Sequence, residues 1–231
     1  MDKLSIIIPS YNEDKTILNV LKRIKDTKSQ KISYEVIVVD DGSIDNTQMI
    51  LSENKQLYDH LLISKVNKGK GAAIKLGLEK VTGDYIIFQD ADLEYDPIEF
   101  KKFIDIILKF KPDCILGSRM NYDKYTRSHN LMNKIANFIL TNFFNILYNT
   151  TFTDIYCCYM AYKKKILDNI ELKTNGFEQH AEILCKIVKK SSVFYEVPVN
   201  YNGRLIQDGK KIRFYHIFPV LFRILIERFK K

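Results

Sequence analysis

The sequence predicts an α/β fold in which a mostly parallel sheet is flanked by helices. Two observations lead to this prediction. The first half of the chain alternates short apolar runs with helical patterns, and several of these runs are apolar without interruption. Such alternation indicates strand–helix–strand units, and uninterrupted apolar strands are typical of a parallel sheet covered on both faces. With 231 residues, of which 46% are hydrophobic, the chain has material for one large domain with or without an appendage.

The expected elements of the first half follow in a regular order. Apolar and β-branched runs predict strands at residues 4–8, 34–39, 61–64, 85–89 and 114–117. Apolar residues at helical spacing predict helices between them, at residues 13–25, 45–57, 71–81 and 97–109. Pro97 suits the first turn of the last of these helices, because a proline at that position loses no helical hydrogen bond.

The second half of the chain has a different pattern. We expect a long, aromatic-rich amphipathic helix at residues 130–148, and two β-like runs, at 156–162 and 193–197, around a helix near 178–190. The C-terminal segment 217–229 is apolar with basic flanks, and it is too short and too charged to span a bilayer. This pattern suits a helix lying in a membrane interface and, equally, a core or oligomer helix.

Charge is distributed unevenly along the chain. Residues 119–231 carry 19 Lys and Arg against 9 Asp and Glu, whereas residues 1–118 carry 17 against 19. We therefore expect the second half to meet an anionic partner. No nucleic-acid-binding motif accompanies this charge, so we expect no nucleic-acid partner and favour an anionic lipid or a lipid phosphate.

The N-terminus and the cysteines favour a cytoplasmic setting. The chain begins with a strand-like run and no basic-then-apolar leader, which argues against secretion. The four cysteines have no metal-binding spacing, and the adjacent Cys157 and Cys158 are poor partners for a disulfide.

The most informative stretch is the acidic run after the fourth expected strand. Asp90, Asp92 and Glu94 alternate there, and carboxylates separated by one residue at a strand end can project toward one point. Such a point needs a hard divalent cation, Mg²⁺ or Mn²⁺, which oxygen ligands favour. The alternative is a solvated acidic loop before the next helix.

Other polar motifs follow other strands, at residues 9–13, 40–43 and 69–71. In parallel sheets, ligands bind outside the carboxyl ends of the strands, so these motifs predict one composite site. Asp41 suits a base or ribose contact, although a helix-capping turn is an alternative. Lys70, between two glycines at a helix start, suits a phosphate, although an ordinary turn is as frequent.

Taken together, these motifs resemble those of the family 2 glycosyltransferases of the GT-A fold. The resemblance rests on Ile-Pro-Ser-Tyr-Asn-Glu at 8–13, Val-Val-Asp-Asp-Gly-Ser at 38–43, Asn-Lys-Gly-Lys-Gly at 67–71 and Asp-Ala-Asp-Leu-Glu at 90–94. Leu-Gly-Ser-Arg at 116–119 is similar to the branch that contains dolichyl-phosphate mannosyltransferases and bacterial polyprenyl-phosphate glycosyltransferases.

The resemblance covers residues 4–119 strongly and 120–213 more loosely. It implies a Rossmann-like GT-A domain at 1–213, with a nucleotide-sugar-binding half at 1–119 and an acceptor half at 120–213. A basic amphipathic tail would follow at 214–231. It also implies a metal-dependent, inverting enzyme that moves one sugar from a GDP-mannose or UDP-hexose type of donor to a polyprenyl or dolichyl phosphate.

The resemblance also implies roles for individual residues. The nucleotide sugar would contact Pro9, Tyr11, Glu13, Asp41, Lys70, Asp90, Ala91, Asp92 and Arg119. The metal would bind Asp92 and Glu94, with Asp90 near the donor or the metal. The phosphate of the acceptor would bind Arg119, Arg127 and Arg204, and the residues expected to act in catalysis are Asp90, Asp92, Arg119 and Asp154.

The nature of the acceptor decides whether a base is needed. A lipid phosphate is already ionised near pH 7 and needs cations, whereas a hydroxyl must lose a proton to a carboxylate. Asp154 and Glu178 are the candidate carboxylates for a hydroxyl acceptor on a surface glycan or protein, and the arginines could equally be structural ion-pair partners. The chain has no Trp, so the Gln-x-x-Arg-Trp signature of processive polysaccharide synthases is absent.

Three functional hypotheses remain at this point. The first is transfer to a polyprenyl phosphate by an enzyme bound peripherally at the cytoplasmic face of a membrane. Contact with an anionic membrane surface would fall to the long helix and the basic tail, since no transmembrane segment follows the expected catalytic domain. The second is transfer to a hydroxyl acceptor, and the third is a non-catalytic nucleotide-sugar-binding protein.

Overall fold

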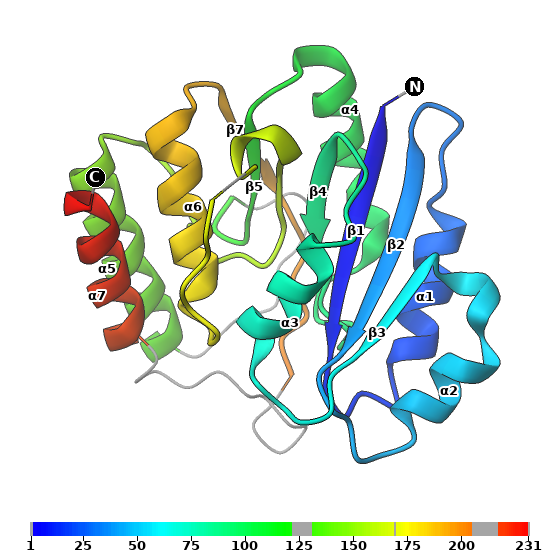
Figure 1. Ribbon diagram of the computed structural model, residues 1–231. Helices are drawn as coiled ribbons and strands as arrows, with labels where there is room; N and C mark the ends of the chain where they lie inside the picture. The colour runs from blue at the N-terminus through cyan, green and yellow to red at the C-terminus, as the bar shows by residue number, and fades with distance from the viewer. Residues whose placement is uncertain (1, 122–130, 169, 205–216, 231) are drawn as a thin grey trace.

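A computed structural model describes residues 2–121, 131–168, 170–204 and 217–230, which form a sheet of seven strands with helices on both faces (Figure 1). The strand order is β3-β2-β1-β4-β6-β5-β7. The strands are β1 (Lys3–Ser10), β2 (Ser33–Asp40), β3 (His60–Ile63), β4 (Tyr85–Phe88), β5 (Cys114–Ser118), β6 (Met160–Lys163) and β7 (Phe194–Pro198). Strand β6 is antiparallel to both neighbours, and every other pairing is parallel.

The helices are close to the positions that the sequence predicts. They are α1 (Ile17–Asp26), α2 (Thr47–Glu53), α3 (Lys70–Leu78), α4 (Phe100–Phe110), α5 (Leu131–Tyr148), α6 (Gln179–Lys190) and α7 (Ile217–Phe229). Short 3-10 turns are η1 (Lys55–Leu57), η2 (Pro97–Glu99) and η3 (Lys164–Ile166). The predicted α/β class with a mostly parallel, helix-flanked sheet is confirmed.

Helices cover the sheet in two layers. Helix α3 lies in front of β1 and β2, where Gly77 brings its backbone close: a Cβ on Gly77 would lie 2.7 Å from Cγ2 of Ile7 (Figure 1). Helices α1 and α4 lie behind the sheet, and Arg23 of α1 pairs with Asp96 before α4. The central strands are therefore buried on both faces, which explains their uninterrupted apolar sequences.

One strand is shorter than its sequence pattern predicts. The β-like run begins at residue 156, but β6 begins at Met160. The side chain of Asp154 accepts a hydrogen bond from the backbone N–H of Tyr156 at 3.2 Å, so the chain turns there instead of extending. The residues between the turn and the strand, Cys157 to Tyr159, are buried. They contact the residues that flank the acidic run 90–94, since Cys158 and Tyr159 form hydrogen bonds with Tyr95 and Gln89.

Helices α5 and α7 lie side by side at one end of the molecule (Figure 1). Helix α7 packs against α5 and α6 through Val220 and Ile224, and the hydroxyl of Tyr148 donates to the carbonyl of Ile224 at 3.2 Å. The predicted tail at 214–231 therefore contains a helix that packs on the domain. Its predicted boundary at 213 lies outside the described residues and stays a prediction.

Helix α5 has large apolar residues both on its packed face and on its exposed face. Helix α5 packs with Asn137, Leu140, Thr141, Phe144 and Tyr148. Its exposed residues include Leu131, Met132, Ile135, Phe138, Ile139 and Ile146. Within residues 2–121, 131–168, 170–204 and 217–230, every helix is too short or too polar to cross a lipid bilayer.

A buried carboxylate ties the N-terminal edge of the sheet together and predicts acid sensitivity. Glu35 of β2 accepts hydrogen bonds from Lys3 Nζ (2.8 Å), Ser5 Oγ (2.5 Å) and the backbone N–H of Thr82 (2.8 Å). Burial alone would raise the pKa of Glu35, but these hydrogen bonds lower it from 4.5 to about 2. Since the folded-state pKa is the lower one, the stabilisation is complete above the unfolded value and is lost as the pH falls toward 2.

We therefore expect Glu35→Gln to lower the free energy of unfolding at pH 7 by about 2 kcal/mol. The difference from wild type should shrink between pH 5 and pH 3, because the unfolded wild-type chain takes up its proton in that range. Urea unfolding followed by circular dichroism at several pH values measures this difference. A difference that stays constant with pH would contradict the assignment.

Candidate active site

The predicted motifs meet at the carboxyl ends of β1, β2 and β4, the lower edge of the sheet in Figure 1. Ser10 at the end of β1 pairs with Asp40 at the end of β2, and Ile7 of β1 pairs with Phe88 at the end of β4. Because these strands are parallel and in register, the loops that follow them leave the sheet together. The arrangement brings residues 9–13, 40–43 and 90–94 to one edge.

Hydrogen bonds hold the shape of the acidic loop, which comprises residues 90–94. The side chain of Gln89 donates to the carbonyl oxygens of Asp90 (2.9 Å) and Tyr95 (3.2 Å), and so closes the loop at its base. The carbonyl oxygen of its amide accepts a hydrogen bond from the hydroxyl of Tyr159 at 2.7 Å. Leu93 has a positive φ of 61°, which turns the chain between Asp92 and Glu94.

The loop is held from a second side by the segment after β7. Tyr95 forms an isolated antiparallel bridge with Tyr201, and the N–H of Asn202 donates to the carbonyl of Glu94 at 2.8 Å. The hydroxyl of Tyr201 also donates to Oε2 of Glu94 at 2.5 Å. This pairing brings the segment after β7 against the acidic loop, although the two segments are more than 100 residues apart in sequence.

Lys70 and Asp90 form one charged pair of the site. Lys70 is the first residue of α3, and its Nζ contacts Oδ1 of Asp90 and lies 3.8 Å from Sγ of Cys158. Burial would lower the pKa of Lys70, but the charge of Asp90 raises it. Burial would raise the pKa of Asp90, but Lys70 lowers it. Both side chains are therefore charged at neutral pH.

The glycines beside Lys70 allow a close backbone approach. Gly69 has a φ of 99°, and a Cβ on Gly71 would lie 2.6 Å from the carbonyl carbon of Asn175. The N–H of Ala72 donates to the carbonyl of Asn175 at 3.2 Å, and Nε2 of Gln179 donates to the carbonyl of Gly71 at 2.6 Å. The start of α3 is thus fixed against the start of α6.

Arg204 joins three carboxylates at the same edge. Its guanidinium donates to both carboxylate oxygens of Glu13, from Nη2 at 3.0 Å and from Nη1 at 3.2 Å. Nη2 also lies 2.8 Å from Oδ2 of Asp92, and the backbone N–H of Arg204 donates to Oε1 of Glu94 at 2.7 Å. Two of the predicted metal ligands, Asp92 and Glu94, therefore contact an arginine that the sequence assigns to the acceptor.

The carboxylates of this edge raise each other's proton affinity. The pKa of Asp92 is raised to about 6, first by burial and then by the negative charges of Asp90 and Glu94, and Arg204 only partly offsets this. The site therefore has an excess of negative charge. Among the described residues, no group of three or more acidic, His or Cys side chains is arranged to hold a metal ion.

Arg119 and Asp154 form a second, buried pair next to Tyr201. Nε of Arg119 lies 2.6 Å from Oδ2 of Asp154, Nη2 lies 2.8 Å from Oδ1, and the backbone N–H of Arg119 also donates to Oδ2 at 3.0 Å. The guanidinium lies over the ring of Tyr201, 5.3 Å from its centre. Burial would raise the pKa of Asp154, but Arg119 lowers it, so Asp154 is a poor proton acceptor here.

Asp41 organises the loop before α3. Its carboxylate accepts hydrogen bonds from the backbone N–H groups of Lys68 (3.1 Å) and Gly69 (2.8 Å). Pro9 lies in β1 opposite Val39, Tyr11 follows that strand, and Ala91 is buried in the acidic loop. The roles predicted for these residues with a nucleotide sugar are not tested by the contacts and stay predictions.

Of the remaining candidates, Arg127 is outside the described residues. Glu178 precedes α6 and accepts a hydrogen bond from the N–H of Gly176 at 3.3 Å.

Sequence reasoning missed two residues of the site. Tyr201 contacts both the acidic loop and Arg119, and Gln89 closes the loop. The position of Gln89 between a strand and an acidic run could have indicated a role in the loop, whereas nothing around Tyr201 in the sequence indicates its contacts.

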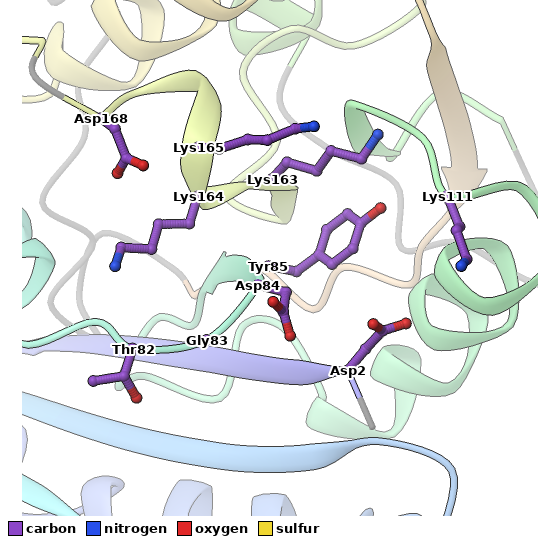
Figure 2. Close-up of a pocket in the computed structure, with 10 residues that line it drawn as sticks. All are labelled: Asp2, Thr82, Gly83, Asp84, Tyr85, Lys111, Lys163, Lys164, Lys165 and Asp168. Atoms are coloured by element: carbon purple, nitrogen blue, oxygen red, sulfur yellow. The ribbon is translucent and has the colours of Figure 1, made fainter.

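A separate pocket lies at the opposite end of the sheet (Figure 2). It has a volume of about 500 Å³ and is lined by four lysines together with Asp2, Thr82, Gly83, Asp84, Tyr85 and Asp168. Lys111, Lys163, Lys164 and Lys165 are the four lysines. None of the predicted site residues lines it, so the pocket is not part of the candidate active site.

Solved structures show a similar fold. The structure of glucosyl-3-phosphoglycerate synthase from Mycobacterium tuberculosis with Mn²⁺, uridine diphosphate and glucosyl-3-phosphoglycerate is similar, with a TM-score of 0.73 and 17% identity. The match covers 98% of this chain and 80% of that one. TarS from S. aureus, solved with UDP-GlcNAc, has a TM-score of 0.65 and 16% identity, covering 99% and 68%. The fold is that of a GT-A glycosyltransferase.

The family follows from the sequence. The model of glycosyl transferase family 2 matches residues 5–171, so the chain belongs to that family, and the family resemblance of the motifs is confirmed. Its curated relatives include a hexosyltransferase.

Two curated relatives are archaeal enzymes. The dolichol-phosphate mannosyltransferase of Pyrococcus furiosus is 30% identical over 213 residues, which cover 90% of this chain and 59% of the relative. The low-salt glycan biosynthesis hexosyltransferase Agl6 of Haloferax volcanii is 27% identical over 202 residues, covering 87% and 48%. The chain thus spans about half the length of these relatives.

Proposed function

We propose that this glycosyltransferase moves a single hexose from a nucleotide sugar to the phosphate of a polyprenyl lipid, with the help of a divalent cation. The observation that carries the proposal is the pairing of Arg119 with Asp154 beside the acidic loop. The carboxylate best placed as a base is bound by three N–H groups of Arg119, and its pKa is lowered. The site therefore offers arginines to an anionic acceptor, which needs no base.

Charge supports a divalent cation at the acidic loop. In the described part of the chain, Lys70 balances Asp90, while Arg204 is shared among Glu13, Asp92 and Glu94. The resulting excess of negative charge suits Mg²⁺ or Mn²⁺, for which carboxylates are preferred ligands. Asp92 is the residue best placed to hold the ion, with Asp90 and Glu94 on either side of it in the loop. When bound, the cation stabilises the charge of the leaving diphosphate.

The donor would lie across the ends of β1, β2 and β4. In this proposal Lys70, at the start of α3, binds a phosphate of the donor, and Tyr11 and Asp41 bind its base and ribose. The two solved relatives were bound to uridine diphosphate or UDP-GlcNAc, which supports a nucleotide-sugar donor. The mannosyltransferase of Pyrococcus furiosus supports a polyprenyl phosphate as the acceptor.

One experiment tests the proposal. The pure protein is incubated with Mn²⁺ and a panel of UDP- and GDP-sugars, with and without a polyprenyl phosphate, and nucleoside diphosphate release and the lipid product are measured. We expect release that depends on both the cation and the lipid phosphate. Release that requires a saccharide or peptide hydroxyl and is lost in Glu178→Gln would favour the hydroxyl acceptor instead.

The exposed apolar face of α5 and α7 supports contact with a membrane. In α7, four large residues are exposed by 40% or more: Phe218, Phe222, Leu225 and Phe229. Helix α5 contains no acidic residue, and the one acidic residue of α7, Glu227, is buried and paired with Arg223. The exposed charged residues of the two helices, Lys134 and Arg228, are cationic, which suits the surface of an anionic bilayer.

We expect the double variant Phe218→Ser, Phe222→Ser to bind anionic liposomes about tenfold or more weakly than wild type, because two aromatic side chains no longer enter the interface. Co-sedimentation with phosphatidylglycerol vesicles measures the binding. The matched control is Ile44→Ser, Val66→Ser, which removes two exposed apolar residues from the loops after β2 and β3. If both variants lose vesicle binding equally, or if the Phe218→Ser, Phe222→Ser variant loses none, the proposed membrane contact is wrong.

A further inference from the structure

Arg204 occupies a place that a cation bound to the acidic loop would share. Its Nη2 lies 2.8 Å from Oδ2 of Asp92 and 3.0 Å from Oε1 of Glu13, and its Nε lies 3.8 Å from Oε1 of Glu94. The side chain is only 22% exposed, and Nε is buried without a hydrogen-bond partner. The guanidinium is thus held by charge at the meeting point of three carboxylates, with one of its donors unused.

A divalent ion and this guanidinium compete for the same oxygens. Oxygen ligands bind Mg²⁺ or Mn²⁺ at about 2.0–2.2 Å, so an ion on Oδ2 of Asp92 would lie close to Nη2 of Arg204. Two cations at such a separation repel each other strongly when neither is in bulk water. Glu94 is less available to an ion, because one carboxylate oxygen accepts a hydrogen bond from the hydroxyl of Tyr201 and the other from the backbone N–H of Arg204.

The environment of Arg204 differs from that of Arg119, which one carboxylate binds through two parallel contacts. Arg204 instead is shared among residues from two separate loops, Glu13 after β1 and Asp92 and Glu94 after β4. In the described part of the chain, Arg204 is the one arginine that contacts all three carboxylates. Its removal would therefore leave them without this positive charge.

We propose that Arg204 is an internal counter-ion that a divalent cation replaces. Binding of the cation together with the donor diphosphate frees the guanidinium from Asp92 and Glu13, and the freed guanidinium then binds the anionic group of the acceptor. The last step rests on the proposed function, whereas the competition between Arg204 and the cation does not.

The first test measures Mn²⁺ binding to the substrate-free protein by electron paramagnetic resonance. We expect Arg204→Gln to bind Mn²⁺ about tenfold or more tightly than wild type, because the competing cation is gone. Arg204→Lys, which cannot contact Glu13 and Asp92 at once through a planar fork, should lie between the two. The matched control is Arg23→Gln, which removes a nearby positive charge that pairs with Asp96 instead.

The outcomes separate this inference from the proposed function. Equal Mn²⁺ affinity in wild type and Arg204→Gln, or an equal gain in Arg23→Gln, would overturn the counter-ion role. In a second arm, binding of soluble farnesyl phosphate is measured with Mn²⁺ and UDP or GDP present or absent. Binding to wild type only when both are present, lost in Arg204→Gln, is expected. If Arg204→Gln binds Mn²⁺ more tightly but the wild type does not bind farnesyl phosphate, the counter-ion role of Arg204 stands and the lipid-phosphate acceptor is overturned.

Discussion

Replacement of Asp92 by asparagine is expected to lower kcat about 1000-fold while the protein stays folded. Asp92 lies in the middle of the acidic loop, where burial and the charges of Asp90 and Glu94 raise its pKa and where it contacts Arg204. A neutral amide weakens the hold on a divalent cation, so the leaving diphosphate is less stabilised in the transition state, at a cost of several kcal/mol. Nucleoside diphosphate release with the best donor of the panel measures the effect.

The stability of this variant separates a catalytic from a structural effect. Burial and the charges of Asp90 and Glu94 raise the pKa of Asp92, so removing its charge relieves repulsion and should not lower the Tm. The amide oxygen of asparagine can still accept the hydrogen bond from the N–H of Glu94 that Asp92 accepts at 3.0 Å. The control is Asp105→Asn, an exposed position on α4. Wild-type activity that is the same in EDTA as in Mn²⁺ would contradict the explanation.

Local sequence patterns were sufficient to predict most of the fold. The strands and helices of the first half lie close to their predicted positions because β1, β2, β4 and β5 are largely buried and α1 and α4 each have one apolar stripe. The same patterns placed the polar motifs at strand ends. Register and direction were harder, since nothing in residues 156–162 shows that β6 is inserted antiparallel between β4 and β5.

Partners of charged side chains were the part that sequence could not provide. Arg204 and Glu13 are 191 residues apart, and Arg119 and Asp154 are 35 residues apart, so neither ion pair has a local signature. The sequence predicts that these residues belong to one site, but only the structure shows which of them form ion pairs with one another. In the same way, periodicity finds an apolar face on α5 but cannot say whether protein, lipid or water covers it.

Replacement of Arg119 by lysine is expected to slow transfer to a polyprenyl phosphate about 100-fold. Lysine keeps the charge but loses the planar fork that binds Asp154 through Nε and Nη2, so the cation is no longer fixed over Tyr201. Hydrolysis of the donor by water should change by less than about threefold, because that reaction needs no acceptor phosphate. Arg23→Lys, on the surface of α1, is the control.

Asp154→Asn then distinguishes a positioning carboxylate from a base. If Asp154 acts by holding Arg119, the variant should show a raised KM for the lipid phosphate, and the double variant with Arg119→Lys should be little worse than either single one. Both effects arise because the two side chains form one unit. If instead Asp154→Asn or Glu178→Gln removes all activity while Arg119→Lys and Arg204→Lys behave as wild type, a carboxylate base acts on a hydroxyl. The polyprenyl phosphate is then not the acceptor.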